Sequence, residues 1–322
     1  MRAYFWGTRG SLPASTTAQE IQKKISNAIN MFRSLCPKTE DEIEDFIRRK
    51  LPFSVRGGYG GNTSCIEIRG QDEYVICDAG TGLRDFGNHA LQLGNPGKNG
   101  STTIECHILM SHLHWDHIQG FPFFTPAYIP GNNINIYGCH SILEQAFINQ
   151  QNPPYFPVPL KEMKANIVFH TLEPGKIYDI AGLSVKAIKQ NHPGDSYGYS
   201  FLKEGRKIVY STDAEHKRTS EEEIDHRIDF FGNADLLIFD AQYTLADAIG
   251  AKENWGHSNN LMAVELSIQA GVKRLCLFHN EHTYDDDALD HFLDDTRKYL
   301  QCRADAYPLK IDLAYDGLEI EA

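Results

Sequence analysis

Short apolar segments bounded by turn residues recur along the chain, a pattern typical of β-strands. We predict strands at Ala3–Trp6, Ser64–Ile68, Tyr74–Asp78, Ile104–Ser111, Ile134–Tyr137, Ile167–Thr171, Leu183–Gln190, Tyr199–Lys203, Lys207–Ser211, Leu236–Asp240, Arg274–His279 and Ile311–Ile320, the last with a hairpin turn at Asp316-Gly317. We predict helices at Ser141–Asn149, Asn259–Ala270 and Asp286–Leu300. Strands in two runs with interleaved helices indicate a mixed α/β (α+β) fold, a sheet sandwich covered by helices, as one domain over residues 1–322.

Residues 17–51 have the pattern of an insertion between the first strand and the second. Two capping boxes, Thr17 with Glu20 and Thr39 with Glu42, begin its two halves. The apolar residues that follow have helical spacing: Ile21, Ile25, Ile29, Phe32, Ile43, Phe46, Ile47 and Leu51. We therefore predict an inserted helical hairpin over 17–51, which is either a structural addition or a lid or dimer contact.

A proline-rich loop over Asn149–Leu160 carries Tyr155 and Phe156. Proline prevents regular strand pairing here, so the loop is stiff and irregular. The two aromatic rings could stack on a base or another flat ligand, or they could anchor the loop to the core. Both interpretations remain open from the sequence.

Composition limits the classes of function. The chain has 322 residues, 41% of them hydrophobic, which is enough for a large core. Its 31 Lys and Arg and 43 Asp and Glu give a net charge of −12, which argues against a protein that holds long nucleic acid by its phosphates. The N-terminus lacks a signal-peptide core and no segment approaches a membrane span, so we expect no membrane partner. Seven cysteines without a C-x-x-C pair predict reduced thiols in a cytoplasmic protein.

The segment from His112 to His117 contains four side chains that can bind a metal: His112, His114, Asp116 and His117. It follows the apolar run Ile104–Met110, so these side chains lie at the end of a strand and can converge on one point. Neutral imidazole and carboxylate together suit Zn²⁺ or a similar divalent ion. The sequence therefore predicts a metal site here.

Three further ligand candidates stand at or just beyond strand ends: His192, Asp213 and His279. Each alone has an ordinary structural explanation, as a hydrogen-bonded histidine or a helix-capping aspartate. Together with the first cluster they make seven ligands, enough for two adjacent ions bridged by one carboxylate.

These motifs, with the turn Asp78-Ala79-Gly80-Thr81-Gly82, resemble those of the metallo-β-lactamase superfamily over nearly the whole chain apart from the insertion. The resemblance implies an αββα sandwich with an inserted helical hairpin. It also implies that one ion is held by His112, His114 and His192, that the other is held by Asp116, His117 and His279, and that Asp213 bridges them. Asp78 would order the ligand loop. His282 is a rival for the last position, and we prefer His279 because it ends the strand directly.

Three shorter motifs resemble the phosphodiesterase branch that includes tRNase Z and cyclic-nucleotide phosphodiesterases: Gly7–Pro13, Gly60–Cys65 and Trp255–Ser258. In that branch the histidine of the GHS turn assists the leaving group or the transition state, which implies this role for His257. Asp240 could orient it. We expect Asp116, His257 and Asp240 to act in catalysis. The loop Thr8–Ser11 could contact a phosphate or only shape the turn.

We expect a dinuclear metal-dependent hydrolase that cleaves a small or cyclic nucleotide phosphodiester through a hydroxide bridging two divalent ions. Zn²⁺ is the expected metal, with Mn²⁺ or Fe²⁺ open. The alternatives are tRNA 3′-end processing and thioester or lactone hydrolysis. The expected partner is a small phosphodiester or nucleotide rather than a long nucleic acid, because the chain is acidic and shows no basic, glycine-rich arm. The resemblance also suggests a homodimer.

Overall fold

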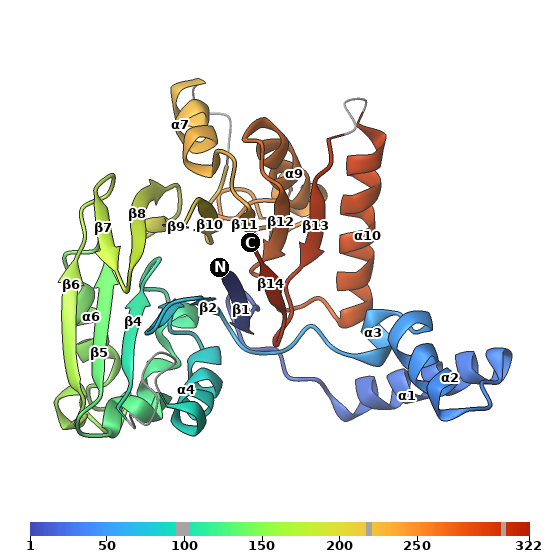
Figure 1. Cartoon of the computed structure of the whole chain (residues 1–322), viewed down its shortest axis with the longest axis horizontal. Coiled ribbons are helices and arrows are strands. Elements are labelled where there is room, and N and C mark those ends of the chain that lie inside the picture. The colour runs from blue at the N-terminus through green and yellow to red at the C-terminus, as the bar shows by residue number, and fades with distance from the viewer. Residues whose placement is uncertain (95–102, 217–220, 251, 304–306) are drawn as a thin grey trace.

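Two seven-stranded sheets form the centre of the molecule (Figure 1). The computed structural model describes residues 1–94, 103–216, 221–250, 252–303 and 307–322. The first sheet has the strand order β14 (Glu319–Glu321), β1 (Arg2–Gly7), β2 (Cys65–Arg69), β3 (Tyr74–Cys77), β4 (Glu105–Leu109), β5 (Asn133–Gly138) and β6 (Asn166–Thr171). The second has the order β13 (Lys310–Leu313), β12 (Arg274–Phe278), β11 (Leu236–Asp240), β10 (Arg206–Ser211), β9 (Ser196–Lys203), β8 (Leu183–Gln190) and β7 (Ile177–Ile180).

The sheets pack against each other through alternate residues of their strands, because successive side chains of a strand point to opposite faces. From the first sheet, Phe5 and Ile68 join one buried cluster with Val185, Phe201 and Ile208 of the second. The remaining faces are covered by helices (Figure 1). The predicted two-sheet sandwich covered by helices is confirmed.

Helices cover each sheet through buried apolar faces. The first sheet is covered by α4 (Gly82–Leu93) and α6 (Leu143–Gln150), and the second by α7 (Glu221–Phe231), α9 (Asn260–Gln269) and α10 (Asp286–Cys302). The loops contain the short elements α5 (Trp115–Ile118), η2 (Phe121–Phe123), η3 (Thr125–Tyr128), η4 (Leu160–Glu162) and α8 (Leu245–Ala248). No helix among the described residues has both the length and the apolar character needed to cross a membrane.

Parallel pairing determines where the functional loops meet. Strands β3 to β6 are parallel neighbours in the first sheet, and β10 to β13 are parallel neighbours in the second. Loops that leave the carboxyl ends of parallel neighbours emerge at the same edge of a sheet. The loops after β4, β10, β11 and β12 can therefore supply side chains to one site between the sheets.

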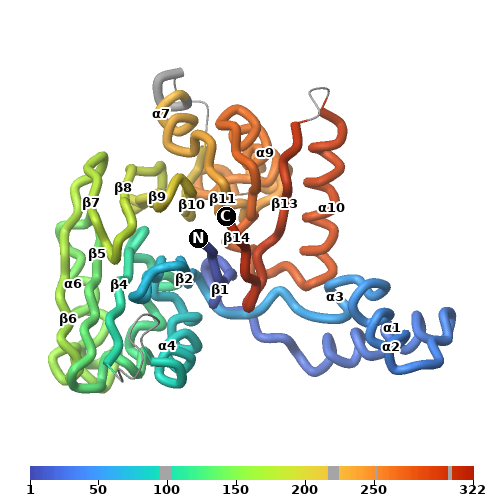
Figure 2. The backbone as a smooth tube through the Cα atoms, in the orientation of Figure 1, coloured from blue at the N-terminus to red at the C-terminus, as the bar shows by residue number. Residues whose placement is uncertain are grey.

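The segment after β1 is helical, with α1 (Ala18–Leu35), α2 (Glu40–Asp45), the π-helical turn η1 (Phe46–Lys50) and α3 (Phe53–Arg56). Both predicted capping boxes are present, at Thr17 and Thr39. No residue of α1 or α2 is buried, whereas Phe46 is buried and packs edge-on against Phe32, with ring centroids 5.7 Å apart. Figure 2 shows these helices extending beyond the end of α10.

Several elements differ from the sequence prediction. The expected hairpin at Asp316-Gly317 is wrong, because β13 pairs with β12 in one sheet while β14 pairs with β1 in the other. Asp316 instead accepts hydrogen bonds from the backbone N–H groups of Gly61 and Asn62, both at 3.0 Å, so the chain crosses between the sheets here. Strand β7 and helices α4 and α7 were not predicted.

Candidate metal centre

The loop after β4 is held by a buried carboxylate at the end of β3. Asp78 accepts hydrogen bonds from the backbone N–H and the hydroxyl of Ser111, both at 2.7 Å, and from the Tyr210 hydroxyl at 2.6 Å. It also lies 2.7 Å from Nδ1 of His117. When that nitrogen donates its proton to Asp78, Nε2 of His117 is left free as a ligand atom. The short helix α5 brings Asp116 and His117 to the same side of this loop.

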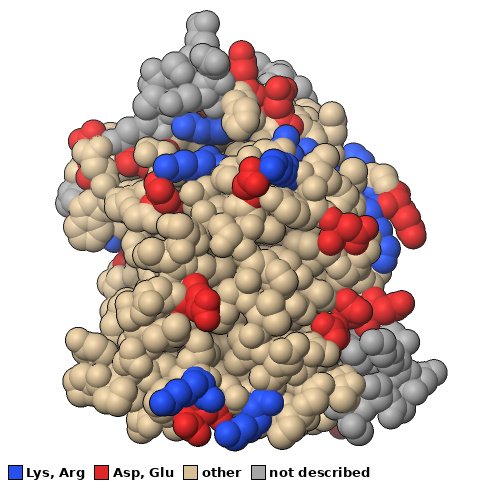
Figure 3. All heavy atoms as spheres, turned by 90° about the vertical axis from the view of Figure 1, so that its left-hand side faces the viewer, with Lys and Arg blue, Asp and Glu red and all other residues tan. Residues whose placement is uncertain are grey.

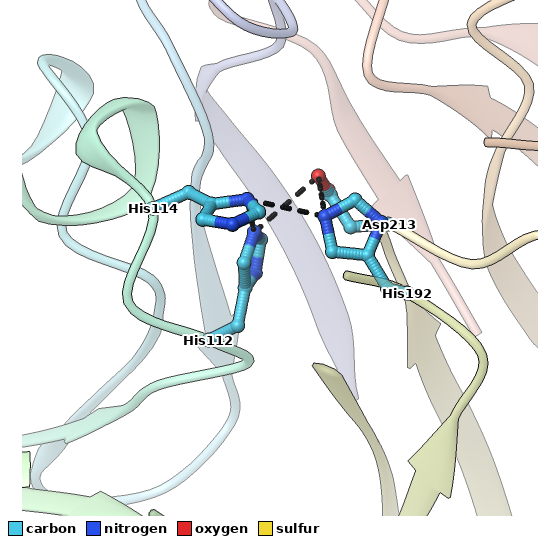
Figure 4. Close-up of side chains that lie close together, drawn as sticks. All are labelled: His112, His114, His192 and Asp213. Atoms are coloured by element: carbon cyan, nitrogen blue, oxygen red, sulfur yellow. Dashed lines mark hydrogen bonds and ion pairs between the residues drawn. The ribbon is translucent and has the colours of Figure 1, made fainter. Parts of the chain in front are cut away.

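A first group of possible ligands comprises His112, His114, His192 and Asp213. These four side chains point toward one another (Figure 4). His112 and His114 come from the loop after β4, His192 from the loop after β8, and Asp213 from the loop after β10. Nδ1 of His114 lies 3.0 Å from Nε2 of His112 and 3.1 Å from Nε2 of His192. Oδ2 of Asp213 lies 3.5 and 3.7 Å from the same two Nε2 atoms.

A second group comprises Asp116, His117, Asp213 and His279. Oδ1 of Asp213 and Oδ2 of Asp116 each lie 3.2 Å from both Nε2 of His117 and Nε2 of His279. Those two imidazole nitrogens are 3.3 Å apart. Asp213 therefore presents one carboxylate oxygen to each group.

The spacing of these atoms fits a pair of metal ions. Ligand atoms about 2.0–2.1 Å from a tetrahedral ion are about 3.3 Å from one another. The distances given above between atoms of the two groups run from 3.0 to 3.7 Å. The donors are imidazole and carboxylate, which suit a divalent metal. All seven predicted ligands thus lie together in two groups that share Asp213.

Electrostatics supports the same interpretation. Burial lowers the pKa values of His112, His114 and His192, which keeps these imidazoles in the neutral form that binds metal. Burial would also lower the pKa of His117, but Asp213, Asp116 and Asp78 together raise it well above its ordinary value. Negative charge is therefore concentrated around His117, where a bound cation would neutralise it.

His257 and Asp240 form a separate pair beside the ligand groups. Nδ1 of His257 donates to Oδ2 of Asp240 at 2.9 Å, and its ring stacks on His279 with centroids 5.0 Å apart. Although burial alone would lower it, the negative charges of Asp240 and then Asp213 raise the pKa of His257 to about 9. Asp240 thus favours the protonated imidazole, in which Nε2–H is the second donor.

Three other predicted features, namely His282, the opening loop and the proline-rich loop, lie outside the two ligand groups. His282 is outside the ligand groups found among the described residues, and its Nδ1 lies 3.3 Å from Glu281. The guanidinium of Arg9 donates to the carbonyls of Gly60, Glu281 and Tyr284, so the opening loop braces the turns beneath the site. In the proline-rich loop, Phe156 packs edge-on against Phe123 at 5.6 Å, whereas Tyr155 is exposed.

Gln242 is a supporting residue that was not predicted, and Gly10 was predicted only as part of the opening loop. The side-chain oxygen of Gln242 lies 3.2 Å from Nδ1 of His279, and accepting that proton leaves Nε2 free. A Cβ atom on Gly10 would lie 2.4 Å from the His279 ring, so this position has no room for a side chain. Gln242 follows β11 without any motif, and its role depends on a long-range contact that sequence spacing does not show.

Residues 73–280, more than half of the chain, match the family described as "Beta-lactamase superfamily domain". Ribonuclease Z of Thermoplasma acidophilum is 24% identical over 246 residues, which cover 60% of this chain and 74% of the relative. Ribonuclease Z of Oceanobacillus iheyensis is 26% identical over 243 residues, covering 59% and 76%.

Two solved structures have similar folds. The metallo-beta-lactamase fold protein YhfI from Bacillus subtilis has a TM-score of 0.66 at 17% identity, with 100% of this chain and 98% of that chain covered. The short form of human tRNase Z has a TM-score of 0.58 at 21% identity, with 100% and 99% covered. At these identities the likeness shows the fold alone.

The relatives correct one prediction. We expected a small phosphodiester or nucleotide partner and no long nucleic acid, and this is contradicted by the matches to proteins named ribonuclease Z. The prediction relied on the whole-chain charge of −12. A net charge is a sum over the surface, and it does not determine the local field near a cation site.

The expectation of a hydrolase of this fold agrees with the family match, the named relatives and the His/Asp cluster. The chain belongs to the beta-lactamase superfamily, and it is a hydrolase with a side-chain cluster suited to a divalent metal.

Proposed function

We propose that this chain is a metal-dependent phosphodiesterase that hydrolyses phosphodiester bonds in RNA, with the 3′ end of precursor tRNA as the first substrate to test. The observation that carries this proposal is the pair of ligand groups sharing Asp213, with the His257–Asp240 pair beside them. The relatives named ribonuclease Z supply the substrate class. The ligand set alone would suit carbonyl and phosphoryl chemistry equally.

The seven side chains would hold two divalent ions, and we propose zinc, because imidazole and carboxylate at tetrahedral spacing are its usual ligands in proteins. Bound ions of this kind lower the pKa of water and stabilise negative charge on a phosphoryl group. Within the protein, Asp78 and Gln242 orient His117 and His279 through their Nδ1 atoms.

His257 supplies a proton for the leaving oxygen in this proposal. Its Nδ1–H donates to Asp240, so the imidazole is fixed and Nε2–H remains to protonate a departing oxygen. Asp240 itself is held by the backbone N–H groups of Ala214 and Gln242, at 3.0 and 3.1 Å. These contacts support a fixed orientation of the His257 ring beside the ligand groups.

Attraction between basic side chains and the phosphates of the RNA backbone contributes little to binding in this proposal. On the face drawn in Figure 3, uncharged side chains predominate, and the Lys and Arg side chains occur in small groups mixed with Asp and Glu. An acidic chain gains less affinity from counterion release than a basic one. Specific contacts near the ligand groups must therefore contribute more of the affinity for RNA.

A substrate comparison tests the proposal. Zinc-loaded protein is assayed by initial rates on a 3′-extended precursor tRNA, a cyclic mononucleotide and S-lactoylglutathione. We expect the largest kcat/KM with the RNA, and we expect Asp213→Asn to remove it while His282→Ala retains it. A preference for the thioester, or for the cyclic mononucleotide, would overturn the proposed substrate class.

We also propose that the protein is located in the cytoplasm. All seven cysteines lie in the described residues and are free thiols, which supports a reducing compartment such as the cytoplasm. Fractionation of the native host with detection of the chain in each fraction tests this directly.

A further inference from the structure

Two of the chain's three tryptophans lie exposed beside the candidate metal centre. Trp115 is 72% exposed and stands between His114 and Asp116 in the ligand loop. Trp255 is 60% exposed and stands two residues before His257. Large aromatic side chains are normally well buried, so two exposed indoles at one site need an explanation.

Short contacts connect the two positions through the site. Nδ1 of His114, the neighbour of Trp115, lies 3.1 Å from Nε2 of His192. Nδ1 of the same His192 donates to the carbonyl of Gly256, the neighbour of Trp255, at 2.8 Å. The His114–His192 pair thus connects the loop after β4, which carries Trp115, with the loop before α9, which carries Trp255.

The ligand groups are exposed only at His114, the neighbour of Trp115 in the chain. Of the seven possible ligands, His114 alone is exposed, and the other six are buried. A substrate must therefore reach the ligand groups past His114. Trp115 is its direct neighbour in the chain and is exposed as well.

The two exposed indoles differ from the third tryptophan in their contacts. Trp6, the third tryptophan, donates to Glu67 at 3.0 Å and packs edge-on against Phe86 at 5.9 Å. Among the described residues, Trp115 and Trp255 make no aromatic or cation–π contact. Their rings are free to receive a flat ligand.

We propose that Trp115 and Trp255 stack against nucleobases of the substrate on either side of the scissile phosphodiester. This inference rests on the proposed function, and it names a single-stranded nucleotide segment as the feature that is bound. Stacking on aromatic rings tolerates any base, because every base has a π-face. It also supplies affinity where a net charge of −12 reduces attraction to the phosphate backbone.

Tryptophan fluorescence measures this binding without turnover. Chelator-treated protein is titrated with a short single-stranded oligoribonucleotide and, as the matched ligand, with an abasic strand of the same length and charge. We expect the base-containing strand to quench the fluorescence and to bind about a hundredfold more tightly than the abasic one, about tenfold for each indole.

Variants assign the effect to the two indoles, with fluorescence anisotropy of a labelled strand as the readout. We expect Trp115→Ala and Trp255→Ala each to weaken binding of the base-containing strand about tenfold, with little change for the abasic strand. Trp115→Phe should retain most of the affinity. Ile177→Ala, at an exposed residue on β7, serves as the matched control and should bind as the wild type does.

Unchanged discrimination between the two strands in both alanine variants, with folding and metal content intact, would overturn the stacking proposal. If such variants still cleave RNA as the wild type does, the proposed function survives without the stacking. If instead the wild-type enzyme discriminates between the strands but cleaves no phosphodiester, the stacking stands and the proposed function fails.

Discussion

Asp213 occupies the position on which both ligand groups depend, because its two oxygens face different groups. Asp213→Asn removes one negative charge and offers only one oxygen acceptor. We expect this variant to retain less than one equivalent of metal per chain, where the wild type retains two, and to lose hydrolysis by at least about a hundredfold. Elemental analysis by mass spectrometry after dialysis measures the metal.

The matched control for that experiment is His282→Ala. His282 lies near His279 in the chain but outside the ligand groups, so its removal should leave both metal content and turnover intact. Loss of metal in His282→Ala together with retention in His279→Ala would reverse the assignment of the last ligand.

His257 provides a test based on the leaving group. His257→Ala should bind metal normally and lower kcat by about 10²- to 10⁴-fold on an RNA diester, whose leaving oxygen needs a proton. The loss should be much smaller with bis(p-nitrophenyl) phosphate, because p-nitrophenolate departs without protonation. Equal losses on both substrates, measured by steady-state kinetics, would assign His257 to substrate binding or structure instead.

His216 gives a prediction for stability and pH. Burial, followed by the charge of Arg227, lowers the pKa of His216 to about 3, and neither ring nitrogen has a hydrogen-bond partner among the described residues. The unfolded chain therefore takes up a proton near pH 6.5 that the folded chain refuses. Above pH 6.5 the effect of His216 on the free energy of unfolding is constant. As the pH falls from about 6.5 toward 3, His216 lowers the free energy of unfolding by about 1.4 kcal/mol per pH unit.

His216→Phe removes this penalty, since the ring already stacks on Phe239 with centroids 4.8 Å apart. We expect the variant's advantage in free energy of unfolding to grow by about 2 kcal/mol between pH 7 and pH 5. Urea titrations at the two pH values measure it. The same difference at both values would show that His216 is not kept neutral by burial.

At the residue scale, the sequence predicted the ligands because His112 to His117 form a compact motif and the others stand at or beyond strand ends. Gln242 and Ser111 could not be predicted. Gln242 makes one hydrogen bond to His279 and Ser111 makes two to Asp78, and such bonds depend on how distant loops meet. Trp115 was visible in the motif, but its exposure was not.

Helix α1 carries an apolar stripe that faces solvent. Ile21, Ile25 and Ile29 are about half exposed, whereas Phe46 of η1 is buried against Phe32. We expect Phe46→Ala to cost about 3 kcal/mol locally and to speed hydrogen exchange across α1 and η1. Ile25→Ser should change exchange little in the monomer. Equal effects of the two substitutions would contradict this packing.

The same stripe bears on the homodimer proposal. Exposed isoleucines along one helix offer a surface on which a second copy could pack. If that surface forms the dimer, Ile25→Ser should shift sedimentation toward the monomer. A dimer unaffected by the substitution would place the interface elsewhere, and the insertion would then be a structural addition or a lid.

At the element scale, local patterns predicted most strands and the two capping boxes, because alternation and capping act over a few residues. The hairpin at Asp316 failed because a turn signal does not determine which strand is the partner. Helix α4 was missed because Gly82 and Gly87 lower its intrinsic helix propensity, while burial of Leu83 and Phe86 against the first sheet stabilises it.

At the scale of the whole molecule, one buried carboxylate ties the two sheets together at the site. Asp78 follows β3 of the first sheet, and the Tyr210 hydroxyl that it binds comes from β10 of the second. The sandwich thus fixes the distance between the loops that carry ligands. The overall architecture could be predicted from the order of elements, but the RNA relationship could not, because net charge averages over surfaces that a substrate never touches.

The most direct test of the account is single-turnover cleavage of a 3′-extended precursor tRNA by protein that is zinc-loaded, chelator-treated and then reloaded. The account predicts cleavage by the loaded protein, its loss on chelation and its return on reloading, with none in Asp213→Asn. The account would be contradicted if wild-type protein that carries two equivalents of metal left the RNA intact. It would also be contradicted if the chelator did not change the rate of cleavage.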